Sequence, residues 1–122
     1  MPVVYLASSL ALAVLELLVQ IDYRKGLHGH LHYPVDFEED LVMILDQGSL
    51  PADWRSPTHL ETTQAIGDAW ASSNASLLLR VPSSVVPSES NYLYNPVHPE
   101  RSKLLIGDGQ PFEFDRRLLH RR

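Results

Sequence analysis

The chain has 122 residues, of which 44% are hydrophobic and 20% are charged, and this size and composition predict one compact domain. It contains no cysteine, which excludes disulfides, thiolate chemistry and cysteine-ligated metal centres and favours a cytoplasmic location. The net charge is -5, but four arginines lie within the last seven residues, so the rest of the chain holds six basic and fifteen acidic side chains. We expect this acidic body to repel nucleic acid, and we assign residues 119–122 to a basic tail.

The first twenty residues predict a short strand that leads into a helix. Val3-Val4-Tyr5 has the composition of a strand, and Ser8 and Ser9 can cap a helix over residues 9–20. No Lys or Arg precedes this apolar run and Glu16 interrupts it, so it lacks the features of a signal peptide or a membrane span. Leu10, Ala13, Val14, Leu17 and Leu18 form one apolar stripe of this helix, and the face with Glu16 is also largely apolar, so we expect the helix to be enclosed on most sides.

Glu16 is a single carboxylate within an otherwise apolar helix. Burying an unpaired carboxylate costs on the order of several kcal/mol unless it is hydrogen-bonded or changes its protonation state. Two hypotheses follow. Glu16 is either a catalytic group that faces a cavity, or a residue at the rim of the helix that pairs with a cation elsewhere in the fold.

Extended and helical segments alternate along the rest of the chain, separated by loops that contain proline. We expect a turn at residues 47–51 and a helix over residues 62–72. The inner stripe of this helix should be Ala65, Ile66, Ala69 and Trp70. The expected extended segments are residues 31–35, 41–45, 77–81, 91–95, 103–106 and 111–114. This mixture predicts an α+β domain with a mixed β-sheet and packed helices.

Three histidines alternate at His28, His30 and His32, and acidic residues follow at positions 38–40. Alternating side chains in a strand point to one side, so these residues are candidates for a metal site and hence for a metal-dependent hydrolase. The stretch is polar and interrupted by glycine, which favours exposed loop histidines instead. We therefore expect no metal.

Ser83 follows Pro82 directly, at the end of an expected strand, where a hydroxyl is presented at the edge of a sheet. No Gly-x-Ser-x-Gly motif surrounds it, so the sequence does not favour a serine hydrolase. Taken alone, such a serine is typical of a turn residue that bonds its own backbone.

A series of short motifs occurs along the chain in a fixed order. They are Val3-Val4-Tyr5-Leu6-Ala7 with the helix that follows it, Leu50-Pro51-Ala52-Asp53-Trp54, Gln64-Ala65-Ile66-Gly67-Asp68-Ala69-Trp70, Arg80-Val81-Pro82-Ser83 and Asn91-Tyr92-Leu93-Tyr94-Asn95-Pro96. Together they resemble the RES domain, a family whose members are typically toxins of bacterial toxin–antitoxin pairs and degrade NAD. The resemblance covers residues 1–118, and only the histidine-rich stretch 27–39 departs from the family pattern.

The resemblance implies a fold like that of ADP-ribosyltransferases, with NAD as substrate and no cofactor. Glu16 matches the family glutamate, Ser83 matches the family serine, and Tyr5 matches an aromatic position of the site. In this interpretation Glu16 stabilises the oxocarbenium that develops when the nicotinamide–ribose bond breaks, and Ser83 orients the carboxylate or the sugar. Tyr5 stacks on the substrate. The implied partners are a helix-turn-helix antitoxin and a second copy of the chain in a homodimer.

The family also has an arginine in a Gly-x-Arg-Trp-Asn motif upstream of the segment that matches Pro2 to Tyr5. Because this sequence begins at Met1, we expect a domain truncated at its amino end. Arg80 is the nearest cation linked to a motif, but nothing in the sequence assigns it the missing role. The alternative is therefore a catalytically impaired fragment that acts only in antitoxin binding or dimerisation.

Overall fold

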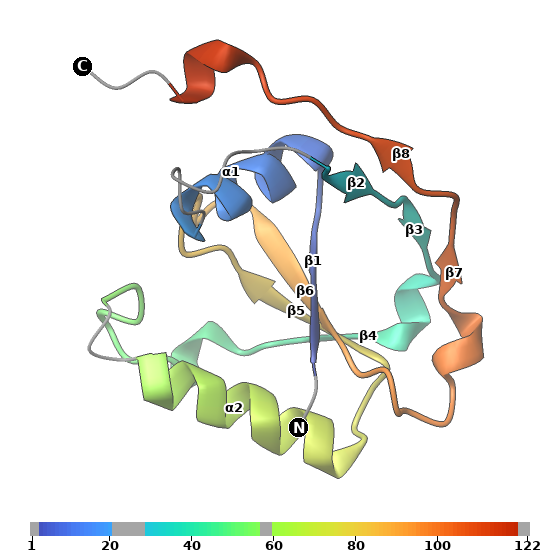
Figure 1. Ribbon diagram of the computed structural model, residues 1–122. Helices are drawn as coiled ribbons and strands as arrows, with labels where there is room; N and C mark the ends of the chain where they lie inside the picture. The colour runs from blue at the N-terminus through green and yellow to red at the C-terminus, as the bar shows by residue number, and fades with distance from the viewer. Residues whose placement is uncertain (1–2, 21–28, 57–59, 120–122) are drawn as a thin grey trace.

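The computed structural model describes residues 3–20, 29–56 and 60–119, and Figure 1 shows how their elements are arranged. The two α-helices are α1 (Leu10–Gln20) and α2 (Leu60–Ser73). The strands are β1 (Val4–Ala7), β2 (Leu31–His32), β3 (Val35–Asp36), β4 (Val42–Ile44), β5 (Leu78–Pro82), β6 (Ser90–Tyr94), β7 (Leu105–Ile106) and β8 (Gln110–Pro111). Short 3₁₀ turns occur at Glu39–Leu41, Gln47–Ser49, Arg101–Lys103 and Arg116–Leu119.

A four-stranded sheet in the order β1-β6-β5-β4 forms the centre of the fold. β6 pairs antiparallel with both β1 and β5, whereas β4 pairs parallel with β5. Two short antiparallel ribbons, β2 with β8 and β3 with β7, lie along one side of the molecule (Figure 1). The predicted α+β class with a mixed sheet is therefore confirmed.

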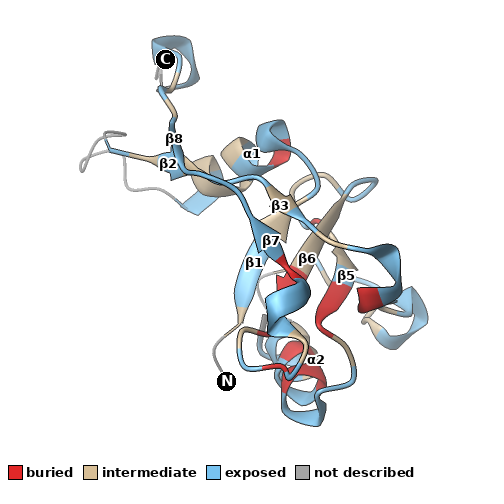
Figure 2. Ribbon diagram, turned by 90° about the vertical axis from the view of Figure 1, so that its right-hand side faces the viewer, coloured by how far each residue is buried: buried red, intermediate tan, exposed pale blue. Residues whose placement is uncertain are grey.

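The sheet has a buried cluster on each face, because neighbouring residues of a strand point to opposite sides. On β5, Leu78 joins a cluster with Leu104, while the next residue, Leu79, joins Trp70 and Leu93. Figure 2 shows buried residues gathered where α2 meets β5, whereas β7 and β8 are exposed along their length. The face that carries Leu79 and Leu93 is the one on which the functional site is built.

α1 begins as the sequence predicts, since the Ser9 hydroxyl accepts a hydrogen bond from the backbone N–H of Leu12 at 3.1 Å. The expected enclosure of this helix on most sides is wrong. Leu12 is its buried residue, whereas Leu10 is 44% exposed and Val19 is 69% exposed. Because α1 is apolar almost all round, its sequence periodicity could not show which face packs on the sheet.

α2 starts two residues earlier and ends one residue later than predicted, and its inner face is rotated relative to the expected stripe. Trp70 is buried as expected, but Ala65 and Ala69 are exposed, and Gly67 and Ala71 are buried in their place. A Cβ atom on Gly67 would lie 3.3 Å from Cδ1 of Leu93. The small residues therefore face the sheet because they allow the helix to approach it closely.

The strands β4, β5 and β6 lie within one residue of their predicted positions and β1 ends two residues later than predicted, whereas the peripheral strands are shorter than predicted. Pro34 separates β2 from β3, because proline has no N–H to donate to a ladder, so the expected strand over residues 31–35 becomes two. Residues 103–106 divide between a 3₁₀ turn and β7, and residues 111–114 contribute only Pro111 to β8. Within the described ranges, no helix is both long and apolar enough to cross a membrane.

Asn95 organises the connection between β6 and the end of α2. Its side chain is fully buried, and Nδ2 donates to the carbonyl of Ala71 at 3.2 Å and to Oδ1 of Asn74 at 2.9 Å. Its Oδ1 accepts from the N–H of Val97 at 3.1 Å. Both ends of the amide are thus hydrogen-bonded, as a buried polar side chain requires.

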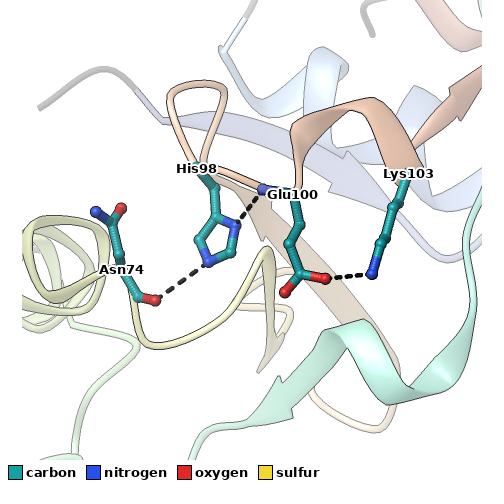
Figure 3. Close-up of polar contacts among 4 residues, drawn as sticks. All are labelled: Asn74, His98, Glu100 and Lys103. Atoms are coloured by element: carbon teal, nitrogen blue, oxygen red, sulfur yellow. Dashed lines mark hydrogen bonds and ion pairs between the residues drawn. The ribbon is translucent and has the colours of Figure 1, made fainter.

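His98 continues this network, and Figure 3 shows its contacts. Nδ1 accepts from the N–H of Glu100 at 3.0 Å, so Nε2 carries the proton of the neutral ring and donates to the carbonyl of Asn74 at 3.1 Å. Asn74 has a left-handed backbone with φ of 52°, a conformation that asparagine tolerates better than most residues. Lys103 forms an exposed ion pair with Glu100. This polar cluster braces the fold around α2 and does not line the cleft described below.

Candidate active site

The carboxylate of Glu16 is hydrogen-bonded by two side chains, one directly after β5 and one on β6. Its Oε1 accepts from the hydroxyl of Ser83 at 2.7 Å and from Nδ2 of Asn91 at 2.8 Å. These partners lie 67 and 75 positions away along the chain. The predicted meeting of Glu16 with Ser83 is therefore confirmed. Glu16 does not pair with a cation among the described residues, so the rim hypothesis is not supported there.

Ser83 occupies a fully enclosed position directly after β5. Its Oγ accepts hydrogen bonds from the N–H groups of Val85 at 3.1 Å and Val86 at 3.0 Å. Because two donors occupy its lone pairs, the single hydroxyl proton is directed at Glu16. Ser83 is thus both a turn residue and a partner of the carboxylate. None of its surface is exposed, so Ser83 contacts Glu16 from behind and does not itself line the cleft.

Asn91 was not singled out as a site residue by the sequence analysis. It lies on β6 two positions before Leu93, so both side chains point to the same face of the sheet. In the sheet, Asn91 pairs with Ala7 of β1 on one side and with Val81 of β5 on the other. Its Oδ1 is buried and has no hydrogen-bond partner within the part of the chain that is described. Such an oxygen is costly to leave unpaired, and because it has no exposed surface it does not face the cleft.

A cleft of about 760 Å³ opens beside these residues. Its walls come from α1, α2 and the loop after β4, and Glu16 projects into it from α1. Its floor is the sheet face formed by Tyr5, Leu79, Val81, Asn91 and Leu93. This volume lies within the range of about 300–1,000 Å³ that is typical of sites for small molecules.

Tyr5 lies at the mouth of the cleft, on the edge strand β1, where it pairs with Leu93. Its side chain is 69% exposed. An aromatic ring that borders a cleft and remains open to solvent can stack on a flat ligand group. The structure thus places Tyr5 at the same cavity as Glu16, as the resemblance implies.

Among the described residues, Arg55 is the cation that lines this cleft. It comes from the loop after β4, and its Nε donates to the carbonyl of Ser84 at 2.8 Å. Arg80 does not line the cleft, because it alternates with Leu79 and Val81 along β5 and points to the opposite side. The sequence carried no signal for Arg55, since this contact spans 29 positions between two loops.

The sequence pattern of the RES domain family matches residues 1–115. The chain belongs to the RES family. It is 40% identical to Toxin Res of Yersinia enterocolitica over 117 residues, which are 94% of this chain and 76% of that relative. It is 38% identical to Toxin Res of Photorhabdus laumondii over 85% of this chain and 67% of the relative. It is 34% identical to the Prs ADP-ribosylating toxin of a Sphingobium strain over 98% of this chain and 76% of that protein.

The RES domain has a fold like that of ADP-ribosyltransferases, so the predicted fold class is confirmed at this level as well. The site residues that the resemblance implied, Glu16, Ser83 and Tyr5, all lie at or directly behind one cleft of this RES domain.

Of the alternating histidines, His30 and His32 do not line the cleft of this RES domain. His30 and His32 make edge-to-face ring contacts with Phe114 and Phe112, at centroid distances of 5.6 and 6.1 Å. His28 lies outside the described residues. Among the described residues, no three His, Cys, Asp or Glu side chains gather in a way that could hold a metal ion.

Proposed function

We propose that this RES protein is an NAD-degrading toxin that breaks the bond between nicotinamide and ribose. The observation that carries the proposal is the Glu16 carboxylate, which Ser83 and Asn91 hold at the wall of a cleft of about 760 Å³. The toxin names of its relatives support the same function.

The chemistry requires a fixed negative charge beside the anomeric carbon. As the C1′–N1 bond breaks, its electron pair leaves with nicotinamide and positive charge develops over C1′ and the ring oxygen. Both Ser83 and Asn91 donate to Oε1 of Glu16, and no described residue donates to Oε2. Oε2 is therefore free to face the sugar. A preorganised group of this kind is worth about 3–4 kcal/mol of transition-state stabilisation.

Tyr5 supplies a contact that suits the nicotinamide riboside part of NAD. Its exposed ring can stack on nicotinamide. Asn91 acts through Glu16, because its Nδ2 donates to Oε1 while its own Oδ1 has no exposed surface. Stacking on Tyr5 orients the bond that breaks toward Glu16.

The acceptor of the ADP-ribosyl group is water, phosphate or a protein, and all three share this bond-breaking step. As a toxin of a toxin–antitoxin pair, the protein acts on the NAD of the cytoplasm until a helix-turn-helix antitoxin binds it. A homodimer is the second assembly that this proposal includes. No cofactor takes part in the proposed reaction.

Glu16→Gln tests the proposal, with purified protein, NAD and a measurement of nicotinamide release. Glutamine keeps the shape of the side chain, and its amide oxygen can still accept from Ser83 and Asn91, so the fold should be retained. We expect nicotinamide release to fall by about 10²–10³-fold. Glu113→Gln removes one charge from an exposed position away from the cleft and should leave the rate unchanged.

The form of the ADP-ribosyl product identifies the acceptor. Free ADP-ribose indicates water, its 1″-phosphate indicates phosphate, and a labelled protein indicates protein modification. Full activity of a folded Glu16→Gln protein would overturn the mechanism. A folded wild-type protein that releases no nicotinamide with any acceptor would overturn the function and favour a module that only binds an antitoxin or dimerises.

A further inference from the structure

Arg55 is a positively charged side chain at the cleft that the bond-breaking chemistry does not use. No other Lys or Arg among the described residues lines this cleft. Its guanidinium is exposed, and no carboxylate within the described ranges pairs with it. The charge is therefore available to an anionic group that enters the cleft.

The backbone fixes the orientation of this guanidinium. Nε donates to the carbonyl of Ser84 at 2.8 Å, which leaves the four N–H groups of the two terminal nitrogens free. A planar fork of this type matches a phosphate, because two parallel N–H groups can bind two of its oxygens. One hydrogen bond thus holds the side chain while its binding edge remains open.

The same hydrogen bond ties Arg55 to the Glu16 centre. Ser84 follows Ser83, whose hydroxyl bonds the Glu16 carboxylate, so one short segment connects the cation with the anion of the cleft. The negative charge of Glu16 is complementary to the ribose that becomes positively charged. The positive charge of Arg55 is complementary to an anionic group farther along the same ligand. In NAD, the pyrophosphate is attached to that ribose.

We propose that Arg55 binds the pyrophosphate of the dinucleotide and thereby places its nicotinamide–ribose bond beside Glu16. The proposal rests on the proposed function for the identity of the substrate, but its binding step can be measured without turnover. Arg55 is a substrate-positioning residue in this scheme, because its terminal nitrogens touch the phosphates and not the bond that breaks.

Calorimetric binding of ADP-ribose tests the contact directly, because this probe keeps the pyrophosphate and lacks nicotinamide. We expect Arg55→Ala to weaken binding by at least about tenfold. Arg55→Lys should restore part of the affinity, since an ammonium keeps the charge and loses the fork. Arg80→Ala removes a cation that does not line the cleft and should bind as the wild type does.

Steady-state kinetics with NAD and with nicotinamide riboside provide a second test. Arg55→Ala should raise the KM for NAD by about tenfold or more and change the reaction of nicotinamide riboside, which has the same bond and no phosphate, by less than about twofold. The thermal midpoint should stay unchanged, which separates this role from a structural one.

Equal ADP-ribose binding by Arg55→Ala and Arg80→Ala overturns the assignment, as does a wild-type protein that does not bind ADP-ribose. If the wild type binds ADP-ribose through Arg55 and yet releases no nicotinamide from NAD, the proposed function fails while the anion site stands.

Discussion

Replacing Ser83 with alanine should show how firmly the fold holds the Glu16 carboxylate. The substitution removes the hydrogen bond donated to Oε1 of Glu16 at 2.7 Å. It also removes the acceptor for the N–H groups of Val85 and Val86, at 3.1 and 3.0 Å. Because Ser83 is fully buried, water cannot take the place of the hydroxyl without a change in the surrounding loop.

The expected loss follows from these three contacts. A buried N–H without an acceptor costs about 1–3 kcal/mol, and a hydrogen bond to a charged group contributes about 1.5–3 kcal/mol. The loop after Ser83 can relax and recover part of this, so we expect the free energy of unfolding to fall by about 2–4 kcal/mol. Glu16 keeps Asn91 as a donor, and nicotinamide release should therefore decrease by about 10–100-fold, less than in Glu16→Gln.

Urea unfolding of Ser83→Ala and Ser84→Ala measures the stability effect. Ser84 is the matched control because it is the next residue, its side chain is exposed, and only its backbone carbonyl is bonded, to Arg55. We expect Ser84→Ala to stay within about 0.5 kcal/mol of the wild type. If Ser83→Ala proves as stable as Ser84→Ala, the hydroxyl does not support the loop or the carboxylate as described.

Two further predictions concern the polar cluster near α2. Asn95→Ala should lower the free energy of unfolding by about 2–4 kcal/mol, because it leaves three buried hydrogen bonds unmade, and a loss below about 0.5 kcal/mol in urea unfolding would contradict this. The Lys103 ammonium, through a hydrogen bond and its charge, lowers the pKa of the Glu100 carboxyl below its ordinary value of 4.5. The ion pair therefore stabilises the fold above that value, and this contribution is lost as the pH falls through the lowered pKa. Lys103→Gln should have a slightly lower thermal midpoint than the wild type at pH 7, and a difference that grows in acid would refute the sign.

Local signals in the sequence were sufficient for the elements that carry the site. Ser9 caps α1, a near-continuous apolar run that stops at Pro82 marks β5, and Pro96 closes the segment of β6, so these boundaries lie within one or two residues of their predicted positions. The sequence also placed one carboxylate in an apolar helix and one serine after a strand, and their order along the chain identified the RES family. Such features depend on neighbours a few residues apart, and a linear sequence contains that information.

Beyond the pairing of Glu16 with Ser83, the tertiary structure alone decided which groups make up the site. α1 is apolar on nearly all sides, so only its packing on the sheet shows that the face with Leu12 and Glu16 turns inward. Asn91 reaches the carboxylate from 75 positions away, through the register of β6 against its neighbours. Arg55 reaches the cleft from a loop that has no periodic pattern, held by a backbone carbonyl 29 positions away. These contacts depend on strand register and loop closure, which join distant parts of the chain and leave no local pattern in the sequence.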